Sequence, residues 1–187
     1  MLTTFQNRSG NCNPKTPLRA AVVLIDMQNP NHMHPVVGGE MFDGISRLQK
    51  LLDFAREHCM PTLFTLYDGG PDLLPRLATY APNHKVFGKF ETDAFSNAAF
   101  GAFLTGRGIT HVAVGGFDIS YSVEATVSSA CARGFNVLTA PELLFGEPLD
   151  HIDYTSSWQR SLIRFAEIGV LKSDFTNLLS DLRSLRN

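Results

Sequence analysis

Apolar positions along this sequence form two repeating kinds of segment. Uninterrupted apolar runs are typical of strands buried on both faces of a parallel sheet. We expect six such strands, at residues 20–25, 61–66, 85–88, 111–115, 135–139 and 169–171. Helical spacing of apolar residues, capping residues and terminating glycines predict helices between them, at residues 43–58, 97–107, 121–133, 155–166 and 174–186. This alternation predicts an α/β fold, a single-domain doubly wound (Rossmann-like) sheet of about six parallel strands flanked by helices.

The first nineteen residues differ from the rest of the chain. Residues 1–19 are polar and rich in Asn, Thr and Pro, which predicts an N-terminal arm in front of a domain at residues 20–187. The arm lacks the apolar run of a signal peptide, and no segment approaches the roughly 20 apolar residues that span a bilayer. We therefore expect a cytoplasmic protein without a membrane partner.

Composition narrows the function classes further. The formal net charge is −2, and the 16 Lys and Arg residues are scattered, which argues against nucleic acid as a partner. The three cysteines, Cys12, Cys59 and Cys131, form no CxxC and are odd in number. This usage favours a reducing compartment, where structural disulfides are rare, and we expect none of the three to be a nucleophile.

Three polar residues stand just beyond predicted strands, where doubly wound sheets bind their ligands. Asp26 ends the first strand and is either an acid whose burial raises its pKa or a cap of the following loop. Lys89 lies between Phe87 and Phe90 and is either a surface charge or a group in an apolar setting. Ser122 opens a helix and is either a nucleophile beside unpaired amides or an N-cap.

Metal and cofactor motifs are not found. His32 and His34 form one HxH pair, which could gather with Asp68 only through folding, and the other histidines are isolated. Neither GxGxxG after the first strand nor GxxxxGK[ST] occurs. We therefore expect no metal and no cofactor.

Three segments, taken together and in this order, resemble the isochorismatase-like hydrolases, also called the cysteine hydrolase superfamily. They are residues 21–29 (AVVLIDMQN), 89–95 (KFETDAF) and 114–126 (VGGFDISYSVEAT), and the resemblance extends over roughly residues 20–171. It implies a six-stranded parallel sheet, assembly as a homodimer or homotetramer, and hydrolysis of small molecules, in many members of amide-type C–N bonds through a Cys–Asp–Lys triad. It also implies a cis peptide near Phe117-Asp118.

The resemblance assigns roles and reveals departures. Asp26 would be the acid/base and Lys89 its cation, whereas Ser122 occupies the position of the nucleophilic cysteine. A serine needs an adjacent base throughout its attack, unlike a thiol, which ionises readily. Asp93 replaces the usual serine and would add a carboxylate near Lys89, and Glu124 stands where amidase-like members often have arginine.

Several functions remain open at this point. The first is a hydrolase of amide-type C–N bonds with Ser122 as nucleophile, and the second is vinyl-ether hydrolysis with Asp26 as general acid. The third is a non-catalytic binding protein, and the fourth is a cysteine hydrolase with an engineered Cys→Ser replacement. In each case we expect a small-molecule ligand, contacted by Gln28, Phe117, Asp118 and Tyr121.

Overall fold

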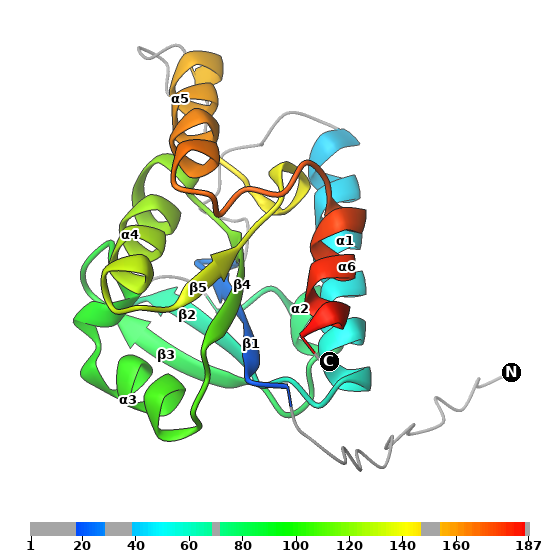
Figure 1. The fold of residues 1–187 in the computed structure, drawn as a ribbon, viewed down its shortest axis with the longest axis vertical. Coiled ribbons are helices and arrows are strands. Elements are labelled where there is room, and N and C mark those ends of the chain that lie inside the picture. Colours follow the sequence, from blue (N-terminus) through cyan, green and yellow to red (C-terminus); the bar gives the residue numbers. More distant parts are fainter. Residues whose placement is uncertain (1–17, 29–38, 69–71, 147–153, 186–187) are drawn as a thin grey trace, which may run out of the picture.

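A parallel sheet with helices on both faces forms the molecule (Figure 1). The computed structural model describes residues 18–28, 39–68, 72–146 and 154–185. Within these residues the sheet has five strands in the order β3-β2-β1-β4-β5, and every pairing is parallel. The strands are β1 (Ala20–Ile25), β2 (Thr62–Tyr67), β3 (Lys85–Lys89), β4 (His111–Gly116) and β5 (Asn136–Leu138). The predicted doubly wound α/β fold is confirmed, with five strands rather than about six.

The segment predicted as a sixth strand runs beside β5 without forming a ladder. Leu171 makes a single parallel bridge to Thr139, supported by backbone hydrogen bonds from Thr139 to Val170 and from Lys172 to Thr139. Gly169 has a positive φ of 75° and Asp174 already caps the next helix, so too few extended residues remain for a full strand.

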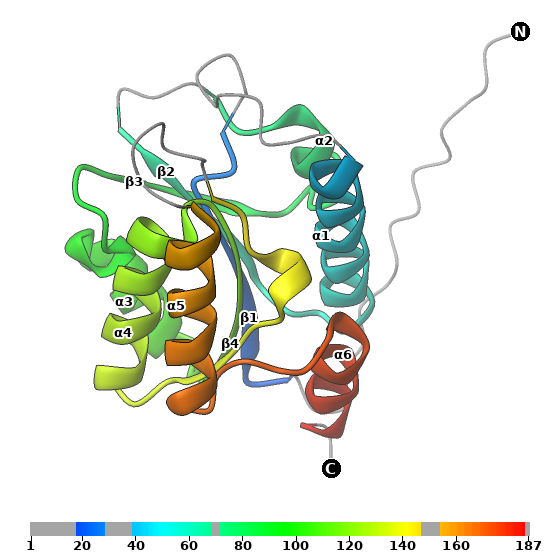
Figure 2. The ribbon, with the colours of Figure 1, turned by 90° about the horizontal axis from the view of Figure 1, so that it is seen from above.

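Helices cover the two faces of the sheet unequally (Figure 2). One face carries α1 (Gly39–Glu57) and α6 (Phe175–Ser184), and the other carries α3 (Ala98–Gly106), α4 (Glu124–Ala132) and α5 (Tyr154–Glu167). Short helical turns complete the structure: α2 (Pro75–Ala78), η1 (Ala94–Ser96), the π-helical η2 (Ile119–Val123) and η3 (Pro141–Leu143).

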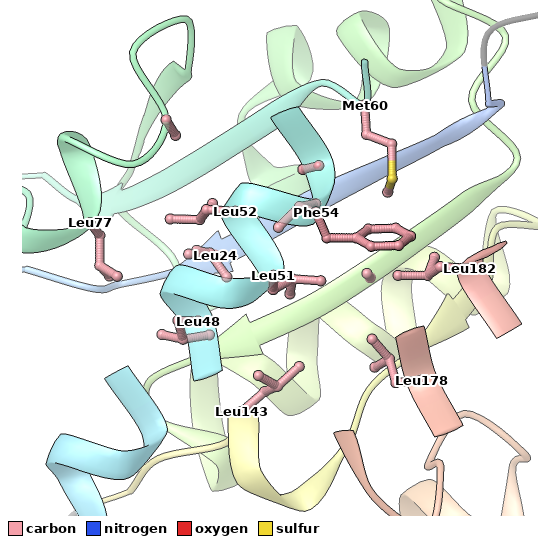
Figure 3. Close-up of a cluster of buried hydrophobic side chains, with 14 of the residues drawn as sticks. Leu24, Leu48, Leu51, Leu52, Phe54, Met60, Leu77, Leu143, Leu178 and Leu182 are labelled. Carbon is pink, nitrogen blue, oxygen red and sulfur yellow. The ribbon is translucent and has the colours of Figure 1, made fainter. Parts of the chain in front are cut away.

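Each face has its own apolar core. All six residues of β1 are buried, and they alternate between the two cores because successive strand side chains point to opposite faces. Figure 3 shows the core under α1, where leucines from α1, α6 and η3 meet β1. Its labelled members are Leu24, Leu48, Leu51, Leu52, Phe54, Met60, Leu77, Leu143, Leu178 and Leu182.

Two expectations fall partly outside the described residues. The predicted arm lies beyond them except for Leu18 and Arg19; Leu18 is buried, and Arg19 donates to the carbonyl of Gly108. His32 and His34 also lie outside the described part of the chain. Within that part, no helix has the length and apolar character needed to cross a membrane.

The cysteines depart from the expectation of reduced thiols. Cys59 is disulfide-bonded, so that expectation was wrong for this residue: pairing depends on proximity in the fold rather than on spacing along the chain. Cys131 in α4 is a free cysteine, and burial raises the pKa of its thiol. A raised pKa keeps the thiol protonated and makes Cys131 a poor nucleophile.

Candidate active site

Asp26, Lys89 and Ser122 come from three different strand ends and meet at one place. Asp26 directly follows β1, Lys89 is the last residue of β3, and Ser122 lies in η2 after β4. The Lys89 Nζ lies 2.8 Å from Asp26 Oδ2 and donates a hydrogen bond of 3.1 Å to Ser122 Oγ. The carboxyl ends of parallel strands share one edge of the sheet, which is why residues so distant in sequence can converge.

The backbone at Asp26 leaves the strand abruptly. Its φ is +49°, in the left-handed region that Asp and Asn tolerate better than most residues. Its N–H still donates to the carbonyl of Thr65 in β2, at 2.9 Å, and its own carbonyl accepts from the N–H of Gln28. This turn directs the carboxylate toward Lys89.

Lys89 is almost completely buried, with 2% of its surface exposed. Its ammonium has three acceptors, Asp26 Oδ2, Ser122 Oγ and the carbonyl of Glu91 at 3.1 Å, which matches its three hydrogens. The ring of Tyr67 adds a cation–π contact, 5.3 Å from Nζ. A buried charge is tolerated when it is paired and fully hydrogen-bonded, and Lys89 meets both conditions.

The turn that carries Ser122 requires unusual backbone geometry. Gly116 has a φ of +130°, and a Cβ there would lie 2.1 Å from the carbonyl oxygen of Ile25, so this position excludes any other residue. The peptide between Phe117 and Asp118 is cis, at the place that the family resemblance implies. Asp118 then begins η2: its carboxylate accepts from the Ser120 N–H, and its carbonyl accepts from Tyr121 and Val123.

Burial raises the pKa of Asp26 above its ordinary value. The hydrogen bond and the charge of Lys89, and a hydrogen bond with Ser122, act in the opposite direction without cancelling the effect of burial. Asp26 Oδ1 is buried and has no hydrogen-bond partner among the described residues. The site therefore holds a carboxyl group with one fixed oxygen and one unoccupied oxygen, suited to taking and returning a proton.

The four residues expected to contact a ligand have different surroundings. The side chain of Gln28 donates to the Tyr67 carbonyl and accepts from the Tyr67 N–H, and so joins the ends of β1 and β2. Phe117 packs against the core under α1, and Asp118 caps η2. Tyr121 is half exposed and lines a cavity of about 370 Å³ between η2, α4 and α5. Asp26, Lys89 and Ser122 do not line that cavity, so contact of these four residues with a ligand stays a prediction.

Two family departures have structural partners. Asp93, expected to add a carboxylate near Lys89, instead accepts hydrogen bonds from the Phe95 N–H and the Ser129 hydroxyl, so it caps η1 and ties it to α4. Glu124 accepts from Ser161 and forms an ion pair with Arg164, which joins α4 to α5.

Sequence reasoning missed two residues of β2 beside the site. Tyr67 contacts the Lys89 ammonium, and Thr65 is a buried hydroxyl next to the turn of Asp26. The available signal for Thr65 was a polar residue within an apolar run, at the end of the strand adjacent to Asp26. No group of three or more His, Cys, Asp or Glu side chains able to hold a metal occurs in the described ranges.

Comparison with known proteins places this arrangement in context. The profile of a family described as the isochorismatase domain matches residues 20–144, which contain the five strands β1 to β5 and all three converging residues. A search of curated protein sequences finds no match.

Solved structures of low sequence identity share the fold. A cysteine hydrolase from Pseudomonas syringae pv. phaseolicola 1448A is 17% identical, with a TM-score of 0.78 over 92% of this chain and 96% of that one. An isochorismatase from Pseudomonas putida KT2440 is 21% identical, with a TM-score of 0.74 over 88% and 93%. The YcaC gene product of Escherichia coli, an octameric hydrolase of unknown specificity, is 17% identical, with a TM-score of 0.74 over 90% and 82%. At these identities the likeness establishes the fold alone.

Proposed function

The chain belongs to the isochorismatase family, and from this membership and the geometry of its site we propose that it is a small-molecule hydrolase that cleaves an amide-type C–N bond. One observation carries the proposal: a single buried ammonium, that of Lys89, contacts both the Asp26 carboxylate and the Ser122 hydroxyl. This arrangement supports Asp26 as general base, Lys89 as its cation and Ser122 as nucleophile.

The first half of the reaction transfers the acyl group to the protein. Ser122 Oγ bonds to the substrate carbonyl carbon while its proton passes to Asp26 and the carbonyl electron pair moves to oxygen. When the C=O bond forms again, the C–N bond breaks and Asp26 returns the proton to the leaving nitrogen. The Lys89 hydrogen bond to Oγ makes the serine oxygen less basic and eases loss of its proton.

The second half consumes one water. Asp26 takes a proton from the water as its oxygen adds to the ester carbonyl. Collapse of this adduct breaks the bond to Ser122 Oγ, and Asp26 returns the proton to that oxygen. The products are an amine and a carboxylic acid, and the site regains its starting protonation state.

Variants of two residues test this mechanism. Ser122→Ala and Asp26→Asn, assayed against a panel of small primary and substituted amides, should each lower kcat/KM by about 10²- to 10⁴-fold, because each removes a group that acts in the transition state. Ser120→Ala is the matched control, since Ser120 lies in the same turn but bonds to Ser157 in α5, and it should retain activity. Full activity in Ser122→Ala would contradict the nucleophilic role.

A second candidate reaction is vinyl-ether hydrolysis, and the raised pKa of Asp26 with its unpartnered Oδ1 favours it. A protonated Asp26 would donate its proton to the vinyl carbon, and water would then add to the resulting oxocarbenium ion and return a proton to Asp26. The hemiketal formed in this way would break its C–O bond to give a carbonyl compound and an alcohol. In that case Asp26→Asn loses turnover of a vinyl-ether panel while Ser122→Ala keeps it. No turnover of either panel, together with ligand-induced thermal stabilisation, would favour a non-catalytic binding protein.

Assembly and location are also part of the proposal. The octameric state of the YcaC structure supports homo-oligomerisation, and we propose a homodimer or homotetramer. A cytoplasmic location is likewise a proposal, and the disulfide at Cys59 counts against it. Light scattering and fractionation of the native protein measure these two properties.

A further inference from the structure

Thr65 lies directly beside the ion pair of the site. The strand β2 runs between β1 and β3, so Asp26 from β1 and Lys89 from β3 meet across its end. Thr65 pairs laterally with Ile25 on one side and Phe87 on the other, and its carbonyl holds the Asp26 N–H. The ion pair between Asp26 and Lys89 therefore spans the carboxyl end of β2, just beyond Thr65.

The side chain of Thr65 faces the same way as the site. Laterally paired residues of neighbouring strands share a sheet face, as do residues two apart on one strand. Thr65 thus shares its face with Phe87 and Ile25, which belong to the apolar core under α3 and α4, and with Lys89 two residues beyond Phe87. Its hydroxyl stands in an apolar layer immediately beneath a buried charge pair.

Two unsatisfied polar atoms belong to residues on adjacent strand ends. Thr65 is 1% exposed, and its Oγ1 has no hydrogen-bond partner among the described residues. Asp26 Oδ1, on the neighbouring strand end, is likewise buried without a partner. A valine would occupy the same space without an unpaired hydroxyl, so packing alone gives no reason for a threonine here.

We propose that Thr65 is a positioning residue whose hydroxyl is linked to Asp26 Oδ1 through one water molecule. Lys89 fixes Oδ2, which leaves Oδ1 as the oxygen that takes and returns the proton. A water molecule held by this hydroxyl suits both states, because it donates to the carboxylate and accepts from the carboxylic acid. This inference rests on the proposed use of Asp26 as acid and base.

The direction of its effect follows from charge. A hydrogen bond to a carboxylate is roughly twice as strong as one between neutral groups, so Thr65 favours the ionised form and opposes the effect of burial on Asp26. The charged group that contacts Asp26 within the described residues is Lys89 from β3, and the ring of Tyr67 from β2 lies against the Lys89 ammonium. The carboxylates of Asp118 and Asp93 are engaged in capping η2 and η1.

The test measures the titration of Asp26 without any substrate. Carbon-13 NMR of protein labelled at the aspartate carboxyl carbons gives one signal per carboxyl, and the Asp26 signal is the one missing from Asp26→Asn. In Thr65→Val the pKa of Asp26 should rise by about one pH unit, a tenfold change in proton affinity. Thr65→Ser keeps the hydroxyl and should restore the wild-type value.

A second threonine of β2 provides the matched control. Thr62 is buried at the amino end of the strand and pairs with Val22, away from the site, so Thr62→Val should leave the Asp26 titration unchanged. An unchanged titration in Thr65→Val, or equal shifts in Thr65→Val and Thr65→Ser, would overturn the inference. If Thr65→Val does not fold, Thr65→Ala against Thr65→Ser gives the same comparison of hydroxyl lost and hydroxyl kept.

The outcome is separate from that of the proposed function. Absence of amide hydrolysis would sink the proposed reaction but leave the titration measurable. Conversely, if Ser122→Ala loses activity but Thr65→Val leaves the Asp26 titration unchanged, the proposed function stands and only the role of Thr65 is wrong. Where turnover is found, the acid limb of kcat/KM should move to higher pH in Thr65→Val and return in Thr65→Ser.

Discussion

The two faces of the sheet share the strands but differ at the carboxyl edge. Under α1 and α6 the core, here called the hydrocarbon face, is made mainly of hydrocarbon side chains, with the thioether of Met60 among those that Figure 3 shows. Under α3, α4 and α5 the core is equally apolar in its body, with β1 and β4 supplying aliphatic residues. At the carboxyl ends of the strands, however, this second core is bordered by four buried polar residues: Thr65, Asp26, Lys89 and Ser122.

The difference separates what holds the fold from what performs chemistry. Burying leucines stabilises the folded state in proportion to the apolar area removed from water. Burying Asp26 and Lys89 removes two charges from water, and their attraction offsets that penalty only while both are present. The α1 face should therefore respond to lost volume, and the site to unpaired charge.

The largest effect on stability should come from breaking the ion pair. In Lys89→Met the Asp26 carboxylate stays buried without a cation, and the free energy of unfolding at pH 7 should fall by about 4 kcal/mol. Urea denaturation followed by circular dichroism measures this loss. It should be smaller at acid pH, where Asp26 takes up a proton and carries no charge.

The matched control removes the second charge as well. Asn tolerates the left-handed backbone of residue 26, so Asp26→Asn adds little strain. The Lys89→Met, Asp26→Asn double variant should recover a large part of the stability lost in Lys89→Met. If the double variant is as unstable as Lys89→Met alone, volume rather than unpaired charge controls the site, and the contrast between the two faces fails.

A smaller loss is expected from the hydrocarbon face. Leu51 is completely buried in α1, and Leu51→Ala should lower the free energy of unfolding by about 3 kcal/mol through lost transfer energy and the cavity left behind. Ile163→Ala, at an exposed position of α5, should change it by less than about 0.5 kcal/mol. The Asp26 titration should be unchanged in Leu51→Ala, and a shifted titration would show that the two faces are coupled.

Much of this architecture follows from local patterns. The buried runs of β1 and β4 contain no polar alternation, which is the signature of a strand covered on both faces, and their ends locate Asp26 and the Ser122 turn. The segment at residues 169–171 carries a similar pattern but is not a strand, because strand formation also depends on the length left between two helices. The spacing of apolar residues in the sequence does not show how much chain the two flanking helices leave for a strand.

The sequence was enough to locate the main residues of the site, but it did not reveal all of their contacts. Position beyond the predicted strands selected Asp26, Lys89 and Ser122 as candidates, and the family resemblance assigned their roles and showed a serine in place of the nucleophilic cysteine. Thr65 was missed because its importance depends on β2 lying between β1 and β3, an order that local patterns do not contain. Gln28 was expected at a ligand, yet its amide bonds to the backbone of Tyr67, a contact 39 residues distant in sequence.

The smallest effect distinguishes the two faces by pH. Because the pKa of Asp26 is raised in the folded state, the folded protein binds a proton that the unfolded chain does not between the ordinary value of 3.8 and the raised one. The contribution of Asp26 to stability is therefore lost as pH rises through this window, and a tenfold difference in proton affinity corresponds to about 1.4 kcal/mol.

Asp26→Asn lacks this titration, so its stability relative to wild type should increase as pH rises through the window, as measured by urea denaturation at a series of pH values. Leu51→Ala removes no titrating group, so its free energy of unfolding should differ from that of wild type by the same amount at every pH. A constant difference between wild type and Asp26→Asn would show that burial does not dominate the environment of Asp26, and the polar end of the second core would then be no less stable than the hydrocarbon face.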